Sequence, residues 1–224
     1  MFRTLLLFLV PKSLHDAQKK HKAFTTTKML RRLAITEDRP DLINTLLKKK
    51  EDLGLGMDHL IANAEILIIG GSETTAFLLS GVTYFLLENP GAHQNLRDEV
   101  RSTFRSQDEI NLISVNKLSY MLACLDEGLR MYPPIANASV GLSIPNSYHP
   151  ERFMGSPQFT NDRCDVFQPF HVGPRNCLGR NLAYSEMRLI LALIMFNFDM
   201  QKNLLMWQKR PLKVYLKPVP RNSP

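Results

Sequence analysis

The segment Phe170–Gly179, FHVGPRNCLG, sets a cysteine in a bend that contains two glycines, a proline and an arginine, directly before a strongly apolar run. A cysteine that serves only for packing behaves as a small hydrophobic residue and needs no such surroundings. Gly173 and Gly179 allow backbone conformations that other residues resist, and Pro174 stiffens the bend. The pattern therefore predicts a loop shaped around the thiol of Cys177.

The residue types in this loop suit a metal cofactor that carries carboxylates. Cys177 lies at the expected start of a helix from about Leu178, where backbone N–H groups and the helix dipole favour a thiolate. Arg175 offers a planar fork of donors for a carboxylate, and Phe170 adds an aromatic ring. Haem with a cysteine as axial ligand fits this description. The alternative is a nucleophilic cysteine with His171 as its base, but no second residue is evident to orient that histidine.

A second motif, GGSETT (70–75), lies inside the longest expected helix, about residues 57–88, which is apolar on nearly all sides and is therefore expected in the core. Glycines inside a helix cost about 1 kcal/mol each relative to alanine. Gly70 and Gly71 therefore either let a flat ligand approach the backbone or permit a tight helix crossing. Glu73 places an acid beside the hydroxyl of Thr74, a pair that could relay protons.

A third motif is EGLR, Glu127 to Arg130, within an expected helix over 118–134. Its i, i+3 spacing puts the acid and the base on one helix face. On an exposed helix such a pair is common and contributes only about 0.3–0.5 kcal/mol. Leu125, Leu129 and Met131 crowd the same helix, which makes its surroundings less ordinary than those of a solvated pair.

Composition indicates an ordinary globular chain of the mainly α class with minor β structure. The 224 residues are 44% hydrophobic and 22% charged, enough for one sizeable core or two small ones. The three cysteines, Cys124, Cys164 and Cys177, are odd in number and widely spaced, which argues against a disulfide framework. Reduced thiols indicate a compartment that faces the cytosol.

The net charge of +7 is spread over short basic clusters without interleaved aromatic residues. We interpret these clusters as solvated helix faces, with no nucleic-acid partner, and docking to an acidic protein or an anionic lipid surface is the alternative. The apolar run Leu5–Val10 stops at Pro11. It is shorter than the about 20 residues of a membrane span and than a secretory signal core of about 7–15. A buried helix end or a weak contact with a membrane surface fits better.

The three motifs, in this order, resemble those of the cytochrome P-450 family of haem-thiolate monooxygenases. FHVGPRNCLG is similar to its haem-binding signature, GGSETT to its oxygen-activating motif and EGLR to its Glu-x-x-Arg motif. HPERF (149–153) supplies the arginine that usually completes the last of these, Arg152. The longer stretch FQPFHVGPRNCLGRNLAYSEMRLILA looks like fungal members that oxidise secondary metabolites or xenobiotic aromatics.

The resemblance implies a role for each matching residue. Cys177 would be the proximal ligand of the iron of haem b, Arg175 would pair with a propionate, and Phe170 would tune electron donation by the sulfur. Gly173 and Gly179 would shape the loop around the cofactor.

The other motifs receive roles in the same way. Glu73 and Thr74 would deliver protons to bound oxygen, and Gly70 and Gly71 would let the porphyrin and the substrate approach the helix. A buried charge cluster would fix the cysteine loop through Glu127, Arg130 and Arg152.

At the level of the chain, the resemblance implies a single partial domain over 1–224. Its expected parts are amphipathic helices (1–56), the central oxygen-activating helix (57–88), the Glu-x-x-Arg helix (118–134), the PERF segment with the haem-binding loop (149–179), and the last helix with C-terminal strands (180–224). The implied activity inserts one oxygen atom of O2 into a small apolar organic substrate, with an NADPH-dependent reductase as electron donor. Family members typically lie on the endoplasmic reticulum membrane facing the cytosol, and a cytoplasmic or peripheral membrane location is expected here.

The chain is also expected to be a C-terminal portion of the family pattern with an internal deletion. Family members carry a longer, strand-containing segment at the junction of Leu142 and Ser143. Two hypotheses therefore stand side by side. One is a haem-dependent monooxygenase, and the other is a truncated, non-catalytic remnant or interaction protein that lacks a complete substrate pocket.

Overall fold

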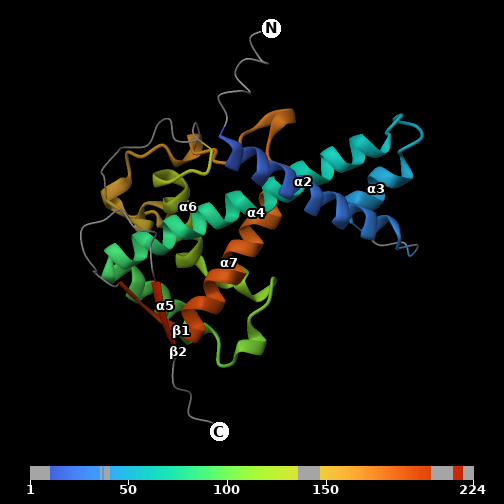
Figure 1. Ribbon diagram of the computed structural model, residues 1–224. Helices are drawn as coiled ribbons and strands as arrows, with labels where there is room; N and C mark the ends of the chain where they lie inside the picture. The colour runs from blue at the N-terminus through green and yellow to red at the C-terminus, as the bar shows by residue number, and fades with distance from the viewer. Residues whose placement is uncertain (1–10, 36, 38–40, 136–146, 203–213, 219–224) are drawn as a thin grey trace. The chain divides into compact units, whose positions relative to one another are not determined.

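The computed structural model describes residues 11–35, 37, 41–135, 147–202 and 214–218, and its described part is mainly helical, as the sequence predicts (Figure 1). It divides into two compact units, Met1–Ser72 and Glu73–Pro224. The long α-helices are α2 (Lys12–Leu33), α4 (Met57–Glu88), α5 (Pro90–Thr103), α6 (Ser119–Met131) and α7 (Arg180–Asn197), and α3 is a short one (Leu42–Lys48). The expected single domain over 1–224 stays a prediction.

The first unit is built from α2, α3 and the first part of α4. The side chain of Asp41 caps α3 by accepting a hydrogen bond from the backbone N–H of Asn44 at 2.8 Å. The same carboxylate accepts a 2.8 Å hydrogen bond from Nε of Arg32, near the end of α2. This pair ties the end of one helix to the start of the next, above a small apolar core of Met29, Leu60 and Ala64.

Helix α4 has the length that the apolar pattern of its sequence predicts, with Asp58 in its first turn and Pro90 two residues after its end. The expectation that it is buried all round is wrong. One side carries buried residues such as Leu78 and Val82, whereas Ile66 is 69% exposed. By length and composition alone, α4 would be able to cross a membrane.

The second unit packs α5, α6 and α7 around the last part of α4. Two glycines allow a close crossing of α4 and α6. A Cβ at Gly128 would lie 2.4 Å from Cγ2 of Val82, and a Cβ at Gly81 would lie 2.5 Å from the ring of Tyr132. At Gly70 and Gly71 a Cβ would meet no described residue within 4 Å beyond its own helix. The tight crossing that the sequence suggests for Gly70 and Gly71 therefore lies about three turns further along the helix, at Gly81 and Val82.

Short 3-10 turns and one hairpin complete this unit. The antiparallel strands β1 and β2 pair with Phe198 opposite Pro218. Arg101 of α5 holds the start of β1, because its guanidinium donates to the Asp199 carboxylate and to the carbonyls of Met195 and Phe198. The strands are β1 (Phe198–Lys202) and β2 (Val214–Pro218), and the turns are η1 (Gln107–Glu109), η2 (Ser114–Lys117), η3 (Pro150–Met154), η4 (Pro157–Phe159), η5 (Cys164–Val166) and η6 (Gly173–Arg175).

Candidate active site

The cysteine loop, residues 170–179, is closed by its own backbone. The N–H of Cys177 donates to the carbonyl of Phe170 at 2.9 Å, and the N–H of Asn176 donates to the carbonyl of Gly173 at 3.1 Å. Gly173 has a φ of 80°, where glycine is the least strained residue, and His171 adopts the uncommon φ of 63°. Gly173 and the two backbone hydrogen bonds thus fix the course of the loop that carries Cys177.

The thiol of Cys177 is exposed at the end of this loop. A Cβ at Gly179 would lie 3.9 Å from Sγ, so the glycine backbone lies directly beside the sulfur. Helix α7 begins at Arg180 with Gly179 as its N-cap. The helix therefore starts two residues later than the sequence predicts, and Cys177 precedes it instead of occupying its first turn.

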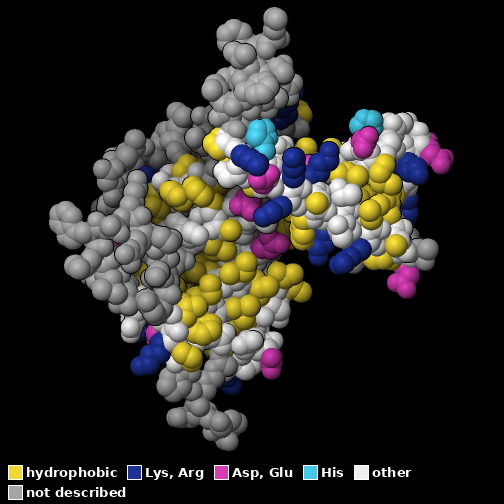
Figure 2. Space-filling view, viewed as in Figure 1, with side chains coloured by type: hydrophobic (Ala, Val, Ile, Leu, Met, Phe, Trp, Pro, Cys, Tyr) yellow, Lys and Arg dark blue, Asp and Glu magenta, His cyan; other side chains and the backbone are white. Residues whose placement is uncertain are grey.

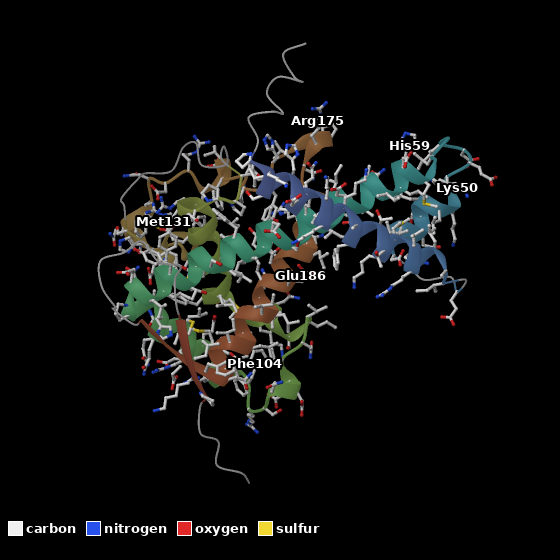
Figure 3. The ribbon with its side chains drawn as sticks, viewed as in Figure 1. Lys50, His59, Phe104, Met131, Arg175 and Glu186 are labelled. Carbon is white, nitrogen blue, oxygen red and sulfur yellow. The ribbon has the colours of Figure 1, made fainter. Side chains whose placement is uncertain are left out.

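The cysteine loop and the first turn of α7 carry exposed apolar side chains and an exposed arginine. Val172, Leu178 and Leu182 are exposed, Leu178 by as much as 79%. Arg175, in η6, is exposed and points away from the helices (Figure 3). Hydrophobic side chains also gather over α7 (Figure 2). The loop thus offers one thiol, an apolar surround and one cation for a carboxylate.

The other two cysteines lie in different surroundings. Cys124 is fully buried in α6, and burial raises the pKa of its thiol far above the usual range. Cys164 is exposed, and its Sγ lies 3.9 Å from the carbonyl oxygen of Arg152. Neither is part of a glycine-shaped loop, which sets Cys177 apart from both.

The donor set of the loop fits a haem. The part of the chain that the structure describes contains no group of three or more histidine, cysteine or acidic side chains that could hold a bare metal ion. The iron of a haem receives most of its ligands from the porphyrin, so a single thiolate from the protein suits it. The exposed thiol beside apolar side chains and Arg175 suits the flat apolar face and the carboxylates of that group.

Phe170 connects the cysteine loop to α7. Its ring packs against the ring of Tyr184 with centroids 5.1 Å apart. The hydroxyl of Tyr184 donates to Oδ1 of Asp126 in α6 at 2.7 Å. Burial raises the pKa of Asp126 from 3.8 to about 6, although this hydrogen bond and the charges of Arg188 and Arg180 oppose the rise. Sequence reasoning missed Asp126, which is the residue directly before the Glu-x-x-Arg motif.

The structure brings Glu127, Arg130 and Arg152 together in one buried cluster. The carboxylate of Glu127 is fully buried and accepts two hydrogen bonds from Arg130, at 2.7 and 2.8 Å. Nε of Arg152 lies 3.3 Å from the same carboxylate. The N–H of His149 donates to Glu127 Oε1 at 3.0 Å. The pair is thus buried, and the alternative of an ordinary solvated pair is wrong.

A fourth charged residue, Asp162, completes this cluster. Its Oδ2 accepts a hydrogen bond from Nη1 of Arg152, whose guanidinium also lies 4.2 Å above the ring of Phe159. Two carboxylates therefore face two guanidinium groups, so the buried charge is balanced. Burial lowers the pKa of Arg152 and the charge of Glu127 raises it. No motif in the sequence marks Asp162, because its partner is ten residues away across a turn.

The residues of GGSETT lie on α4 near the boundary of the two units. Gly70 and Gly71 belong to the first unit, and Glu73 and Thr74 belong to the second. Glu73 is exposed, Thr74 is half-buried and Thr75 is buried. The expectation that Glu73 is an acid enclosed by an apolar helix is therefore wrong, since its side chain faces solvent.

Comparisons with known proteins agree with this geometry. A family model described as cytochrome P-450 matches residues 2–139 and 143–221. The interruption falls at the junction of Leu142 and Ser143, where the sequence predicts a missing segment, and that junction lies outside the described residues. The match covers nearly the whole chain, and the chain belongs to the cytochrome P-450 family.

Two fungal relatives and one solved structure give the scale of the similarity. The chain is 40% identical to cytochrome P-450 monooxygenase astA of Talaromyces wortmannii, with 97% of this chain and 53% of the relative covered. It is 43% identical to cytochrome P-450 monooxygenase tpeC of Talaromyces stipitatus, with 91% and 49% covered. A crystal structure of a cytochrome P-450 (CYP102L1) shares the fold with a TM-score of 0.71 at 21% identity, covering 92% of this chain and 57% of that one. The chain thus spans about half the length of the curated relatives it matches.

Proposed function

We propose that the chain carries the haem-thiolate part of a monooxygenase that inserts one oxygen atom of O2 into a small apolar organic substrate. The observation that carries this proposal is the exposed Cys177 thiol in a closed, glycine-shaped loop between apolar side chains and Arg175. Similarity to named fungal monooxygenases supports a place in secondary-metabolite biosynthesis or xenobiotic oxidation. When bound, the haem supplies the activation of dioxygen.

The cysteine loop would hold the haem b through five of its residues. The Cys177 thiolate would bind the iron, and Arg175 would pair with a propionate. Gly179 keeps the backbone close to the sulfur, and Gly173 takes the positive φ that the turn requires. Phe170, whose ring packs against that of Tyr184, would lie near the thiolate and tune its electron donation.

We assign the delivery of protons for the oxygen chemistry to the GGSETT motif of α4. The open space beside Gly70 and Gly71 supports the approach of a flat ligand to the backbone there. Thr74 holds a proton at its hydroxyl, and the exposed Glu73 carboxylate exchanges protons with solvent. The pair would therefore carry protons inward along one helix. Electrons would come from an NADPH-dependent reductase, and contact with a membrane surface would be peripheral.

The cluster of Glu127, Arg130, Arg152 and Asp162 has a positioning role in this proposal. It joins α6 to the segment that contains η3 and leads to the cysteine loop. None of its members is assigned to the reaction itself.

Absorption spectroscopy of the haem-loaded chain tests the central assignment. After reduction and treatment with carbon monoxide, an anionic sulfur ligand shifts the Soret band to the red. Cys177→Ala should abolish this shifted band, whereas Cys164→Ala and Cys124→Ala should keep it. An unchanged band in the Cys177 variant, or a loss only in the Cys164 variant, would remove the proposal.

A second experiment separates proton delivery from binding. Thr74→Ala should leave haem binding nearly intact and divert reducing equivalents from product to released hydrogen peroxide, with product formation lower by about 10²–10⁴-fold. Thr75→Ala is the matched control, because Thr75 is rotated by about 100° around the helix. Equal coupling of electrons to product in both variants would contradict the role of Thr74.

A further inference from the structure

The second unit contains a pocket of about 380 Å³ whose lining comes from η2, α6 and the first part of α7 (Figure 1). Its volume lies in the lower part of the range of about 300–1,000 Å³ that is usual for small-molecule sites. Most of the lining is polar, with Asp126 from α6 and Arg180, Asn181, Tyr184 and Arg188 from α7. None of these residues belongs to the cysteine loop, the charge cluster or GGSETT.

Two guanidinium groups face a single carboxylate in this pocket. Oδ1 of Asp126 accepts the hydrogen bond from the hydroxyl of Tyr184 at 2.7 Å. Arg180 and Arg188 act on Asp126 through their charges, and in the described part of the chain neither forms an ion pair with a carboxylate. The pKa of Asp126 is about 6, so its carboxyl group is ionised at pH 7.5. The lining therefore keeps a surplus of one positive charge at that pH.

The polar groups that carry these charges are held in place and remain open to a ligand. Nη1 of Arg188 donates to Oδ1 of Asn116 at 2.6 Å, which orients the guanidinium. Nε of Arg188 is buried and out of reach, whereas Nη2 keeps accessible surface and has no partner among the described residues. Arg180 is exposed, and Oδ2 of Asp126 is also accessible and accepts no hydrogen bond from a described residue. A ligand in the pocket therefore meets two cationic donors and one free acceptor.

We propose that this pocket binds a small oxyanion that also carries a hydroxyl group, of which hydrogen phosphate is the simplest. The unprotonated oxygens of the anion accept hydrogen bonds from Arg180 and Arg188, whose planar forks of donors suit such groups. The hydroxyl of the anion donates to Oδ2 of Asp126, because an ionised carboxylate can only accept. The site needs no haem, and it stands independently of the activity proposed above.

Hydrogen phosphate and sulfate test this proposal with the whole chain. Both are tetrahedral and mainly doubly charged at pH 7.5, but only hydrogen phosphate has a proton to donate to the Asp126 carboxylate. Calorimetric titration should therefore show hydrogen phosphate binding at least about 10-fold tighter than sulfate, which is the effect of one hydrogen bond to a charged group. No binding of hydrogen phosphate at millimolar concentration, or equal affinities of the two anions, would overturn the proposal.

Asp126→Asn tests the role of the carboxylate. The amide does not repel an anion, and its N–H groups can donate to one, so sulfate should bind tighter than it does to the parent. The preference for hydrogen phosphate should disappear for the same reason. The variant is expected to fold, because the burial that raises the pKa of Asp126 favours a neutral side chain at this position. A preference as large as that of the parent would overturn the assignment of Asp126.

Arg180→Gln tests the role of the cations, with Arg105→Gln as the matched control. Arg180→Gln should weaken both anions by about 10-fold, because one charged donor is lost. Arg105 is exposed and lies outside the pocket, so Arg105→Gln removes the same charge and should bind both anions as the parent does. Equal weakening in the two variants would show attraction to the net charge alone, and unchanged binding in Arg180→Gln would place the anion elsewhere. Either result overturns the proposal, and neither measurement depends on the haem ligand.

Discussion

The buried carboxylate of Glu127 is paired with several donors at once. It receives two hydrogen bonds from Arg130, one from the His149 backbone, and the charge of Arg152. Replacing a buried ion pair by apolar residues can be neutral, but removing one partner leaves an uncompensated buried charge. The cluster is therefore sensitive to single substitutions.

Glu127→Gln should lower the free energy of unfolding by about 3–5 kcal/mol, because both arginines remain buried without that carboxylate. Urea denaturation followed by circular dichroism measures the loss. Arg163→Ala is the control, since Arg163 and Asp165 form an exposed pair whose removal should leave the free energy of unfolding nearly unchanged. Similar losses in the free energy of unfolding of the two variants would show that the buried cluster contributes no more to stability than an exposed pair does.

Asp126 links stability to pH in the direction opposite to most carboxylates. Its pKa is about 6 in the folded protein against 3.8 in the unfolded chain, so the folded state holds more protons between these values. The contribution of this group to stability is therefore complete below about pH 4 and is lost as the pH rises through about 6.

Asp126→Asn should accordingly be more stable than the parent at pH 7.5, by at most about 3 kcal/mol, and the difference should vanish near pH 4. Melting temperatures of both proteins across this range give the result. Asp165→Asn provides the comparison, because the hydrogen bond from Arg163 lowers the pKa of Asp165. If Asp126→Asn raised the melting temperature by the same amount at every pH, the stabilisation would not come from the raised pKa of Asp126.

Residues that act through a local pattern could be predicted from the sequence, and those that act through distant contacts could not. Glu127 and Arg130 share a helix face at fixed spacing, and Cys177 sits among glycines that have no packing purpose. Asp162 reaches Arg152 only because the turn between them folds back. Asp126 gains its environment from Tyr184, which lies 58 residues later in the chain.

Among the elements, the crossing of α4 and α6 depends on the absence of a side chain. Gly128 faces Val82 so closely that a Cβ would stand 2.4 Å from its Cγ2, and Val82 is itself fully buried. The two helices must therefore separate, or Val82 must leave its rotamer, if any larger residue replaces Gly128. The glycine inside EGLR thus has a packing role beside the charged pair.

Gly128→Ala should lower the free energy of unfolding by about 1–3 kcal/mol, the usual cost of overpacking a core. Denaturant titration measures this change, and adding Val82→Ala should recover part of it by freeing the space. At Gly91, where a Cβ would meet nothing within 4 Å, alanine should be neutral or slightly stabilising. A destabilisation at Gly91 equal to that at Gly128 would contradict the packing argument, because an alanine at position 91 meets no neighbour.

The lengths of the helices were predictable where apolar periodicity and prolines mark their limits. α2 (Lys12–Leu33) lies within the range 1–56 in which helices are expected, and α4 ends before Pro90. The start of α7 was misplaced because Leu178, although apolar, belongs to the cysteine loop and is exposed. Strand β1 follows α7 directly at Phe198 without a turn signal, and its existence depends on pairing with β2. Pairing between distant segments is the kind of information that local patterns lack.

At the scale of the whole molecule, α4 contributes residues to both compact units and has an apolar side that the described residues leave exposed. Ile66 and Ile69 are 69% and 44% exposed, respectively, at positions three residues apart on one face. Scattered exposed apolar residues are normal, whereas a contiguous apolar face attracts other apolar surfaces. The sequence predicts an apolar helix here, but its burial depends on what packs against each face, which the helix pattern alone does not specify.

The chain should therefore bind an apolar dye and self-associate through this face of α4. Replacing both Ile66 and Ile69 by glutamine keeps side chains of similar length and good helix propensity, and it should reduce dye fluorescence and concentration-dependent association in analytical ultracentrifugation. Ile113→Gln is the matched control, because Ile113 is 81% exposed beside η2 and lies outside the long helices. A helix face that binds cooperatively loses its affinity when two adjacent apolar contacts are removed, whereas an isolated residue contributes little. Equal effects of the double variant and of Ile113→Gln would mean that the association depends on total exposed apolar area and not on the continuous face of α4.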